Sequence, residues 1–223
     1  MSAADLAPSG TLADVICNRV RSEILSGRRR PQARIRLEEL KAEFNVSWSP
    51  LREALSRLVA EGLIQTDESR GYRVAPVSRA EMSDVIRMRK TLESMALRAS
   101  IEHGDDAWEA DLLAAHHRLT KLEAKRQRKE ELDQWEAWHR HYHDTLSRAC
   151  GSPLLLQFCA QLHDQFARYR KLFLSSHPFD RLVPGEHKKL TDAALARDPD
   201  KACAVIETHI ERTGRNILAC IRE

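Results

Sequence analysis

The chain has 223 residues, of which 42% are apolar, enough to fill the cores of one large or two modest domains. Its formal net charge of +3 neither requires nor excludes nucleic acid as a partner. There is no run of about eighteen apolar residues, and the first residues lack the basic start and apolar core of a signal peptide. The five cysteines form no CxxC pair, which predicts reduced thiols in a cytoplasmic protein without a membrane partner.

Low glycine and proline counts and long charged helical patterns predict a mainly α-helical protein. The segment 46–58 is its most informative stretch. Apolar residues recur there at helical spacing: Leu51, Ala54, Leu55 and Leu58. Ser47 or Ser49 can cap the start of this helix, and Pro50 falls in its first turn. Hydroxyl and guanidinium groups occupy the opposite face, which suits a nucleic-acid groove, although an ordinary surface helix has the same pattern.

The neighbouring segments favour nucleic-acid binding. A first helix is predicted from Leu12, with Val15, Ile16, Val20 and Ile24 on its apolar stripe, and Gly27 ends it. A second short helix spans 37–44, and Asn45 tolerates the left-handed backbone of a tight turn. Segments 63–66 and 72–75 read as strands of a hairpin. Together these elements predict a winged helix-turn-helix domain over residues 1–77.

These residues carry a family resemblance. Val46-Ser47-x-Ser49-Pro50-Leu51-Arg52-Glu53-Ala54-Leu55-x-x-Leu58-x-x-Glu61-Gly62-Leu63, followed by Arg70-Gly71-x-x-Val74, resembles the GntR family of bacterial transcription regulators. The resemblance implies that Arg52 contacts DNA, whereas Trp48 stands where relatives commonly place a DNA-contacting arginine. The candidate DNA-binding residues are Arg36, Ser47, Trp48, Ser49, Arg52, Arg57, Arg70 and Gly71.

Residues 78–223 are predicted to form an all-α helical bundle. Ser78 and Glu81 fit a capping box at the start of a long helix, and Arg89 lies in the middle of the apolar stripe of that helix. An arginine in a core needs an anionic partner, either a nearby carboxylate of the chain, the commoner case, or a bound carboxylate ligand. A later helix from Pro153 has a predicted apolar stripe of Leu155, Phe158, Leu162 and Phe166.

Four histidines are predicted to face the interior of this bundle. His139 and His143 are one turn apart on one helix, and His187 and His209 each lie on the apolar stripe of a later helix. Three or four imidazoles in a bundle suit Zn²⁺, Ni²⁺ or a similar ion. The alternative is that they are simple core residues. His116 also falls on the apolar stripe of its helix, so an inward position does not by itself identify a metal ligand.

A second resemblance covers this domain. Tyr142-His143-x-x-Leu146-x-x-Ala149-x-Gly151-x-Pro153, then Glu186-His187 and His209, resembles the FCD effector domain of FadR-like regulators. In that family an aspartate and three histidines usually hold a divalent metal, and His139 stands here at the aspartate position. Arg89 matches the arginine that these domains use near the effector. Tyr169 and Arg170 are the other candidate effector-binding residues.

The sequence thus predicts a ligand-responsive transcription regulator that acts as a homodimer on a near-palindromic double-stranded operator. A divalent metal and a small carboxylate would bind its C-terminal domain. Three alternatives remain: a regulator for which the metal itself is the signal, a metalloenzyme, and a domain with a vestigial metal site. The absence of an HExxH motif disfavours the metalloenzyme, so the chain is predicted not to be an enzyme.

Overall fold

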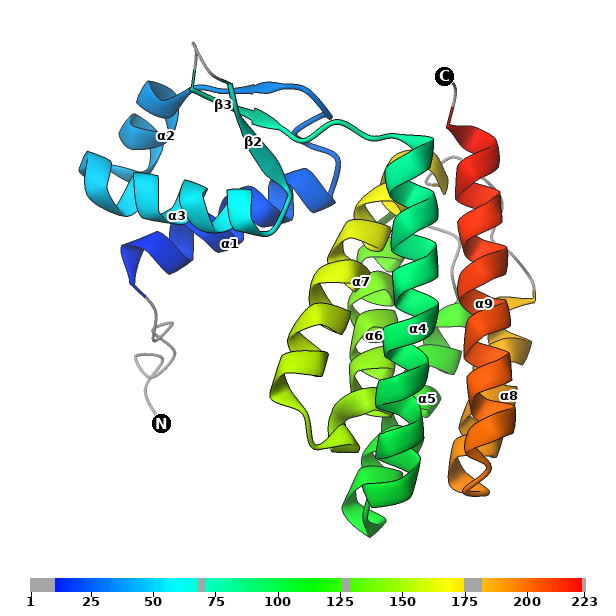
Figure 1. Ribbon diagram of the computed structural model, residues 1–223. Helices are drawn as coiled ribbons and strands as arrows, with labels where there is room; N and C mark the ends of the chain where they lie inside the picture. Colours follow the sequence, from blue (N-terminus) through cyan, green and yellow to red (C-terminus); the bar gives the residue numbers. More distant parts are fainter. Residues whose placement is uncertain (1–10, 68–70, 126–128, 175–181, 222–223) are drawn as a thin grey trace. The chain divides into compact units, whose positions relative to one another are not determined.

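The computed structural model describes residues 11–67, 71–125, 129–174 and 182–221 (Figure 1). The chain divides into two compact units, Met1–Val77 and Ser78–Glu223. Most of the described residues are helical, which confirms the predicted fold class. Within the described ranges, no helix combines the length and apolar character that a membrane span requires.

The N-terminal unit contains three helices and a small sheet. Its elements, in chain order, are α1 (Leu12–Leu25), β1 (Arg34–Ile35), α2 (Leu37–Phe44), α3 (Trp48–Ala60), β2 (Ile64–Asp67) and β3 (Gly71–Val74). The sheet is antiparallel with the order β1-β3-β2. The three helices and the hairpin match the predicted winged helix-turn-helix. The two-residue strand β1 was not predicted, because two residues are too short to show an alternating pattern.

The turn between α2 and α3 has the predicted left-handed residue at the end of α2 but lacks the predicted side-chain cap at the start of α3. Asn45 adopts the left-handed conformation at φ 48°, which ends α2 and redirects the chain. Ser47 is the N-cap residue of α3, but its side chain accepts no capping hydrogen bond. The predicted capping by this hydroxyl is therefore wrong, and its oxygen points elsewhere on an exposed surface.

The apolar face of α3 forms the centre of the N-terminal core. Leu51, Ala54, Leu55 and Leu58 are fully buried, as their spacing predicts. In α1 the buried stripe is rotated relative to the prediction, because Val15 is 41% exposed whereas Ala13 and Cys17 are buried beside Ile16. Ala13 and Cys17 belong to the same core cluster as the buried residues of α3, against which α1 packs.

The C-terminal unit is entirely helical in its described residues. Its elements are α4 (Arg79–His103), α5 (Asp106–Lys125), α6 (Lys129–Ser147), the short 3₁₀ helix η1 (Arg148–Cys150), α7 (Pro153–Leu174), α8 (Val183–Leu195) and α9 (Pro199–Cys220). The long helix α4 packs along α9 and α7, as Figure 1 shows. The helices α5, α6 and α8 complete the bundle.

The start of α4 is capped by the side chain of its N-cap residue, Ser78, and by that of Tyr169 from α7. The Ser78 hydroxyl accepts a hydrogen bond from the Glu81 amide, which is one half of the predicted capping box. The Ser78 amide instead donates to the Tyr169 hydroxyl at 3.0 Å, and that hydroxyl donates to the Glu81 carboxylate. A tyrosine on α7 therefore takes the place of the second half of the box.

In α7 the buried stripe differs from the predicted one. Phe158 is 47% exposed, although its spacing placed it inside, and Cys159, His163, Phe166 and Arg170 are buried instead. The predicted stripe used the longest apolar residues near the start of the helix. The observed stripe is shifted by about one residue and includes two polar side chains, which an apolar pattern cannot reveal.

One glycine sets the distance between α4 and α9. A Cβ atom at Gly214 would lie 2.4 Å from Cδ1 and 2.5 Å from Cγ1 of Ile86. We expect Gly214→Ala to destabilise the protein, because overpacking costs about 1–3 kcal/mol, against a helix-propensity gain of about 1 kcal/mol. Thermal unfolding measures the change, at about 2–4 °C per kcal/mol for a chain of this size.

Gly185→Ala is the matched control. Gly185 also lies in a helix, but a Cβ there would meet nothing within 4 Å. This variant is expected to unfold at the wild-type temperature or slightly above it. Equal stability of the two variants would show that Ile86 does not restrict the space at Gly214.

Candidate metal centre and nucleic-acid interface

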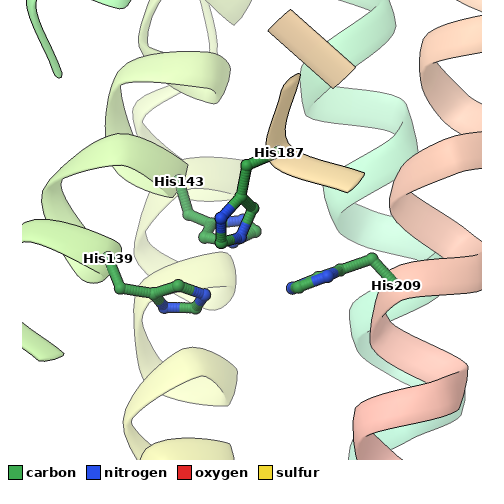
Figure 2. A group of neighbouring side chains, drawn as sticks. All are labelled: His139, His143, His187 and His209. Carbon is green, nitrogen blue, oxygen red and sulfur yellow. The ribbon is translucent and has the colours of Figure 1, made fainter. Parts of the chain in front are cut away.

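Four histidines from three helices meet inside the C-terminal bundle. His139 and His143 project from α6, His187 from α8 and His209 from α9, and all four side chains point toward one another (Figure 2). Each of these residues is at most 4% exposed. One nitrogen from each ring can be chosen so that all four nitrogens lie within 4.8 Å of one another. The sequence prediction that these four residues face inward is confirmed.

Several ring nitrogens in this cluster have no hydrogen-bond partner among the described residues. They are Nδ1 of His139, both nitrogens of His143 and Nε2 of His187. An unsatisfied buried polar group costs about 1–3 kcal/mol, so a fold that collects four such atoms needs a compensating interaction. A cation at the centre of the cluster would supply it.

Carboxylates contact the Nδ1 atoms of two of the rings. His187 Nδ1 lies 2.8 Å from the Glu123 carboxylate, and His209 Nδ1 lies 2.8 Å from that of Glu186. Such a contact fixes the ring orientation and leaves Nε2 free to bind a metal, an arrangement common around metal-ligating histidines. A third ring of the cluster, that of His139, stacks on the Trp135 ring with 4.5 Å between ring centroids.

Burial keeps most of these imidazoles neutral. It lowers the pKa of His139, His143 and His209 well below the ordinary value, and neighbouring positive groups lower each pKa further. A neutral imidazole keeps a lone pair on one nitrogen, which is the form that binds metals. The cluster therefore offers metal-binding nitrogens at neutral pH.

The donor set fits a divalent ion of intermediate softness. Imidazole nitrogens bind Zn²⁺ at about 2.0–2.1 Å, so two nitrogens on one ion are at most about 4.2 Å apart. The observed span of up to 4.8 Å needs only small side-chain adjustments to reach that distance. Four imidazoles without a carboxylate suit zinc or nickel.

Arg89 has an anionic partner within the chain. It is 2% exposed, and its Nε and an η nitrogen donate to the two oxygens of Glu93, one turn later, at 2.5 and 3.1 Å. One of the two predicted partners, a nearby carboxylate of the chain, is therefore present. Glu93 Oε2 also lies 3.8 Å from His143 Nδ1, which connects Arg89 to the histidine cluster.

The other two candidate effector residues are also engaged. The Tyr169 hydroxyl bonds to Ser78 and Glu81 at the start of α4, and Arg170 forms an ion pair with Glu136. The guanidinium groups of Arg89 and Arg170 lie 4.3 and 6.0 Å from the centre of the same Phe166 ring. The two arginines are thus brought together over one aromatic ring, whereas Tyr169 faces the end of α4.

A cavity of about 280 Å³ reaches the histidine cluster between α4, α6 and α7. Its lining includes Glu93, His143, Thr145, Leu156, Cys159 and His163. Arg89, Tyr169 and Arg170 are not among the described residues that line it. Because both His143 and Glu93 face this space, a small molecule in the cavity would lie beside the candidate metal centre.

His163 is the site residue that the sequence prediction missed. It is 4% exposed, its ring lies 5.6 Å from that of His143, and its Nε2 has no partner among the described residues. The prediction assigned the buried face of α7 to Phe158 and Leu162, which places His163 outside the stripe. Its spacing of four residues from Cys159 and three from Phe166 was the available signal.

In the N-terminal unit, the polar face of α3 is exposed. Ser47, Ser49 and Arg52 lie on it and are free of the apolar core. Arg57, in contrast, forms ion pairs with Asp14 of α1 and Glu53 of α3. Its side chain is thus held between two helices of the unit.

The remaining candidate DNA contacts are placed differently. Trp48 is half-buried against the core, and the Lys41 ammonium lies 4.5 Å from the centre of its ring. Arg36 precedes α2 and is largely exposed, although it pairs with Glu39. Gly71 begins β3 with φ 100°, a backbone conformation that favours glycine, and Arg70 lies outside the described residues.

Comparison with known proteins agrees with this arrangement. Residues 12–74 match the gntR family of bacterial regulatory proteins, and residues 84–212 match the FCD domain. The chain is 38% identical over 203 residues to the HTH-type transcriptional regulator BphR of Paraburkholderia xenovorans, covering 90% of this chain and 83% of that one. It is 36% identical over 195 residues to the HTH-type transcriptional repressor GlaR of Escherichia coli, covering 86% and 89%.

Solved structures share the fold. A transcriptional regulator, GntR, from Rhodococcus sp. RHA1 has a TM-score of 0.78 at 19% identity, covering 94% of this chain and 99% of that one. The E. coli protein McbR/YncC has a TM-score of 0.77 at 20% identity, covering 94% and 98%. These families and relatives are transcription regulators and not enzymes. The chain belongs to the GntR family of bacterial DNA-binding transcription regulators and carries an FCD domain.

Proposed function

We propose that this regulator binds its operator as a homodimer and that its FCD domain holds a divalent metal ion and a small carboxylate effector. The observation that carries the proposal is the set of four buried histidines, three of which have ring nitrogens without a partner among the described residues. Their side chains converge from α6, α8 and α9, with one nitrogen of each ring within 4.8 Å of the others. A cation at the point where they converge removes the cost of burying them.

The metal ligands in this proposal are His139, His143, His187 and His209. Glu123 and Glu186 orient two of them through the hydrogen bonds described above. When bound, the ion would supply a positive charge and a coordination position for an oxygen ligand. Zinc and nickel are the ions that four imidazole donors favour.

The effector proposal rests on the chemistry of Arg89. Its guanidinium already receives a carboxylate in bidentate geometry, that of Glu93. A carboxylate effector would therefore exchange for Glu93 on a preformed site. Arg170, over the same Phe166 ring, adds a second positive charge nearby, whereas the Tyr169 hydroxyl bonds to Glu81 at the start of α4.

The proposed response is a shift between two states of the regulator. An effector changes the equilibrium only if it contacts the two states differently. In this proposal the effector replaces Glu93 on Arg89 in one state, and Glu93 keeps that contact in the other. One recognition helix covers a single half-site, so two copies of the chain on a near-palindromic operator are expected. The spacing of the two DNA-binding units would then depend on the state of the bundle.

A second candidate function is metal sensing without an organic effector. It is favoured by the intrachain partners that Arg89 and Arg170 already have. Titration of the operator with and without a chelator, in buffer free of organic acids, distinguishes the two. A change in operator affinity on metal removal alone would support this second function.

Substitution of a metal ligand tests the metal centre. We expect His187→Ala and His209→Ala to be purified without the divalent ion that the wild type retains, because each removes a ring that the chain orients toward the cluster. Elemental analysis of dialysed protein measures the content, about one ion per chain in the wild type. A chelator should lower the unfolding temperature of the wild type but not of these variants.

His141→Ala is the control for this experiment. His141 lies on the same helix as His139 and His143 but is exposed and is not one of the four histidines whose nitrogens converge. It should retain the metal and the chelator response. Full metal content in both His187→Ala and His209→Ala would disprove the proposed centre.

Substitution of Arg52 tests the DNA contact. A duplex selected from a random library by the wild-type protein serves as the operator. Arg52→Ala is expected to bind it about ten- to a hundredfold more weakly, because a lost arginine contact to a base costs about 1–3 kcal/mol. Fluorescence anisotropy at several salt concentrations measures the affinity.

Arg19→Ala removes the same charge from an exposed position on α1, where the side chain pairs with Glu23. It should bind the operator with nearly wild-type affinity. Circular dichroism confirms that both variants keep the fold. If Arg52→Ala binds as tightly as Arg19→Ala at moderate salt, Arg52 is not a DNA contact.

A further inference from the structure

A divalent ion in the histidine cluster, as the proposed function requires, would leave a net positive charge there. This inference rests on that proposed function. Three carboxylates lie beside the cluster, those of Glu93, Glu123 and Glu186. Two guanidinium groups, of Arg89 and Arg212, pair with the first and the last of them. One net negative charge then faces two positive charges of the ion.

Burial makes this imbalance costly. An uncompensated charge inside a protein carries a desolvation penalty of several kcal/mol, and neutral imidazoles do not offset it. All four proposed ligands are imidazoles, so the ligand set itself contains no negative charge. A small anion bound to the ion would restore neutrality.

The cavity beside His143 provides room for such an anion. Its volume of about 280 Å³ exceeds what a small carboxylate needs, and it borders one of the four proposed ligands. The lining also contains Glu93, which is occupied by Arg89, the apolar side chains of Leu156 and Cys159, and the donors Thr145 and Arg148, which bond to the His141 carbonyl and to Asp111. A buried donor that has no partner among the described residues is available to hold an oxygen atom of the anion.

His163 has the properties of that donor. It lies on α7, opposite His143 across the cavity lining, and its ring lies 5.6 Å from that of His143 and 5.9 Å from that of His139. Nε2 of His163 is buried and has no partner among the described residues. His163 is not one of the four histidines whose nitrogens converge within 4.8 Å, so it lies beside the candidate metal site without being one of the proposed ligands.

We propose that a small carboxylate lies in this cavity, bound to the metal ion. In this proposal His163 is a positioning residue that donates a hydrogen bond from Nε2 to that carboxylate. The carboxylate balances the charge of the four-histidine centre, and His163 fixes its orientation. Ligand selection in this regulator thus depends on α7. Acids too long for the cavity, or without a carboxylate oxygen within reach of His163, are excluded.

Cobalt-substituted full-length protein and acetate as the probe test this proposal. Co²⁺ in a nitrogen site absorbs visible light, and its spectrum changes when an oxygen ligand joins it. The wild type should show a saturable spectral change with sodium acetate and none with sodium chloride at equal ionic strength. His163→Ala should keep its cobalt but bind acetate about tenfold or more weakly, as expected for a lost hydrogen bond to a charged group.

Two further variants separate positioning from simple packing. His163→Gln places an amide nitrogen near the position of Nε2 and should restore most of the acetate affinity. His116→Ala changes a half-buried histidine that contacts the Tyr142 ring but does not line the cavity, so it should bind acetate like the wild type.

The outcomes distinguish this inference from the proposed function. Equal acetate affinity in His163→Ala and wild type, or no acetate response in the cobalt-loaded wild type, would overturn the role of His163 while leaving the metal centre intact. Loss of cobalt from both His163→Ala and His163→Gln would also overturn it, since His163 would then be part of the metal site. A wild type that binds no cobalt overturns the metal centre itself.

Discussion

The main constraint on the C-terminal bundle is that its buried imidazole nitrogens require binding partners. Three helices, α6, α8 and α9, place four histidines around one point, and the described residues supply hydrogen bonds for only some of their nitrogens. Carboxylates fix the rings of His187 and His209 from outside, so the unpaired atoms are held toward the centre. Apolar packing alone would not select such residues, because leucine at these positions fills the same space at lower cost.

Much of this arrangement could be predicted from the sequence. The spacing of His139 and His143 places both on the buried face of one helix, and each of the other two histidines falls on an apolar stripe. The helix-turn-helix could be predicted because Asn45 and the apolar residues of α3 report local geometry. The GntR motif and the FCD motif then supplied functions that periodicity cannot.

The rest depends on contacts between residues far apart in the chain. Glu93 as the partner of Arg89 was one of two open possibilities, and only the packed bundle selects it. His163 was missed because α7 buries polar side chains along a stripe shifted from its most apolar residues. Tyr169 looked like an effector ligand from its inward position, yet its hydroxyl reaches the backbone of Ser78, 91 residues away. Tertiary packing, which local patterns do not encode, decides each of these cases.

The hydrogen bond between Tyr169 and Ser78 has a mechanical consequence. Ser78 is the first residue of the C-terminal unit and therefore the point where the chain leaves the DNA-binding unit. Tyr169 shares α7 with Phe166, against which Arg89 rests, and with His163, which lines the cavity. A helix is stiff over this length, so the positions of His163, Phe166 and Tyr169 along α7 are fixed relative to one another. One phenol group thus connects the helix that lines the cavity to the first residue after the DNA-binding unit.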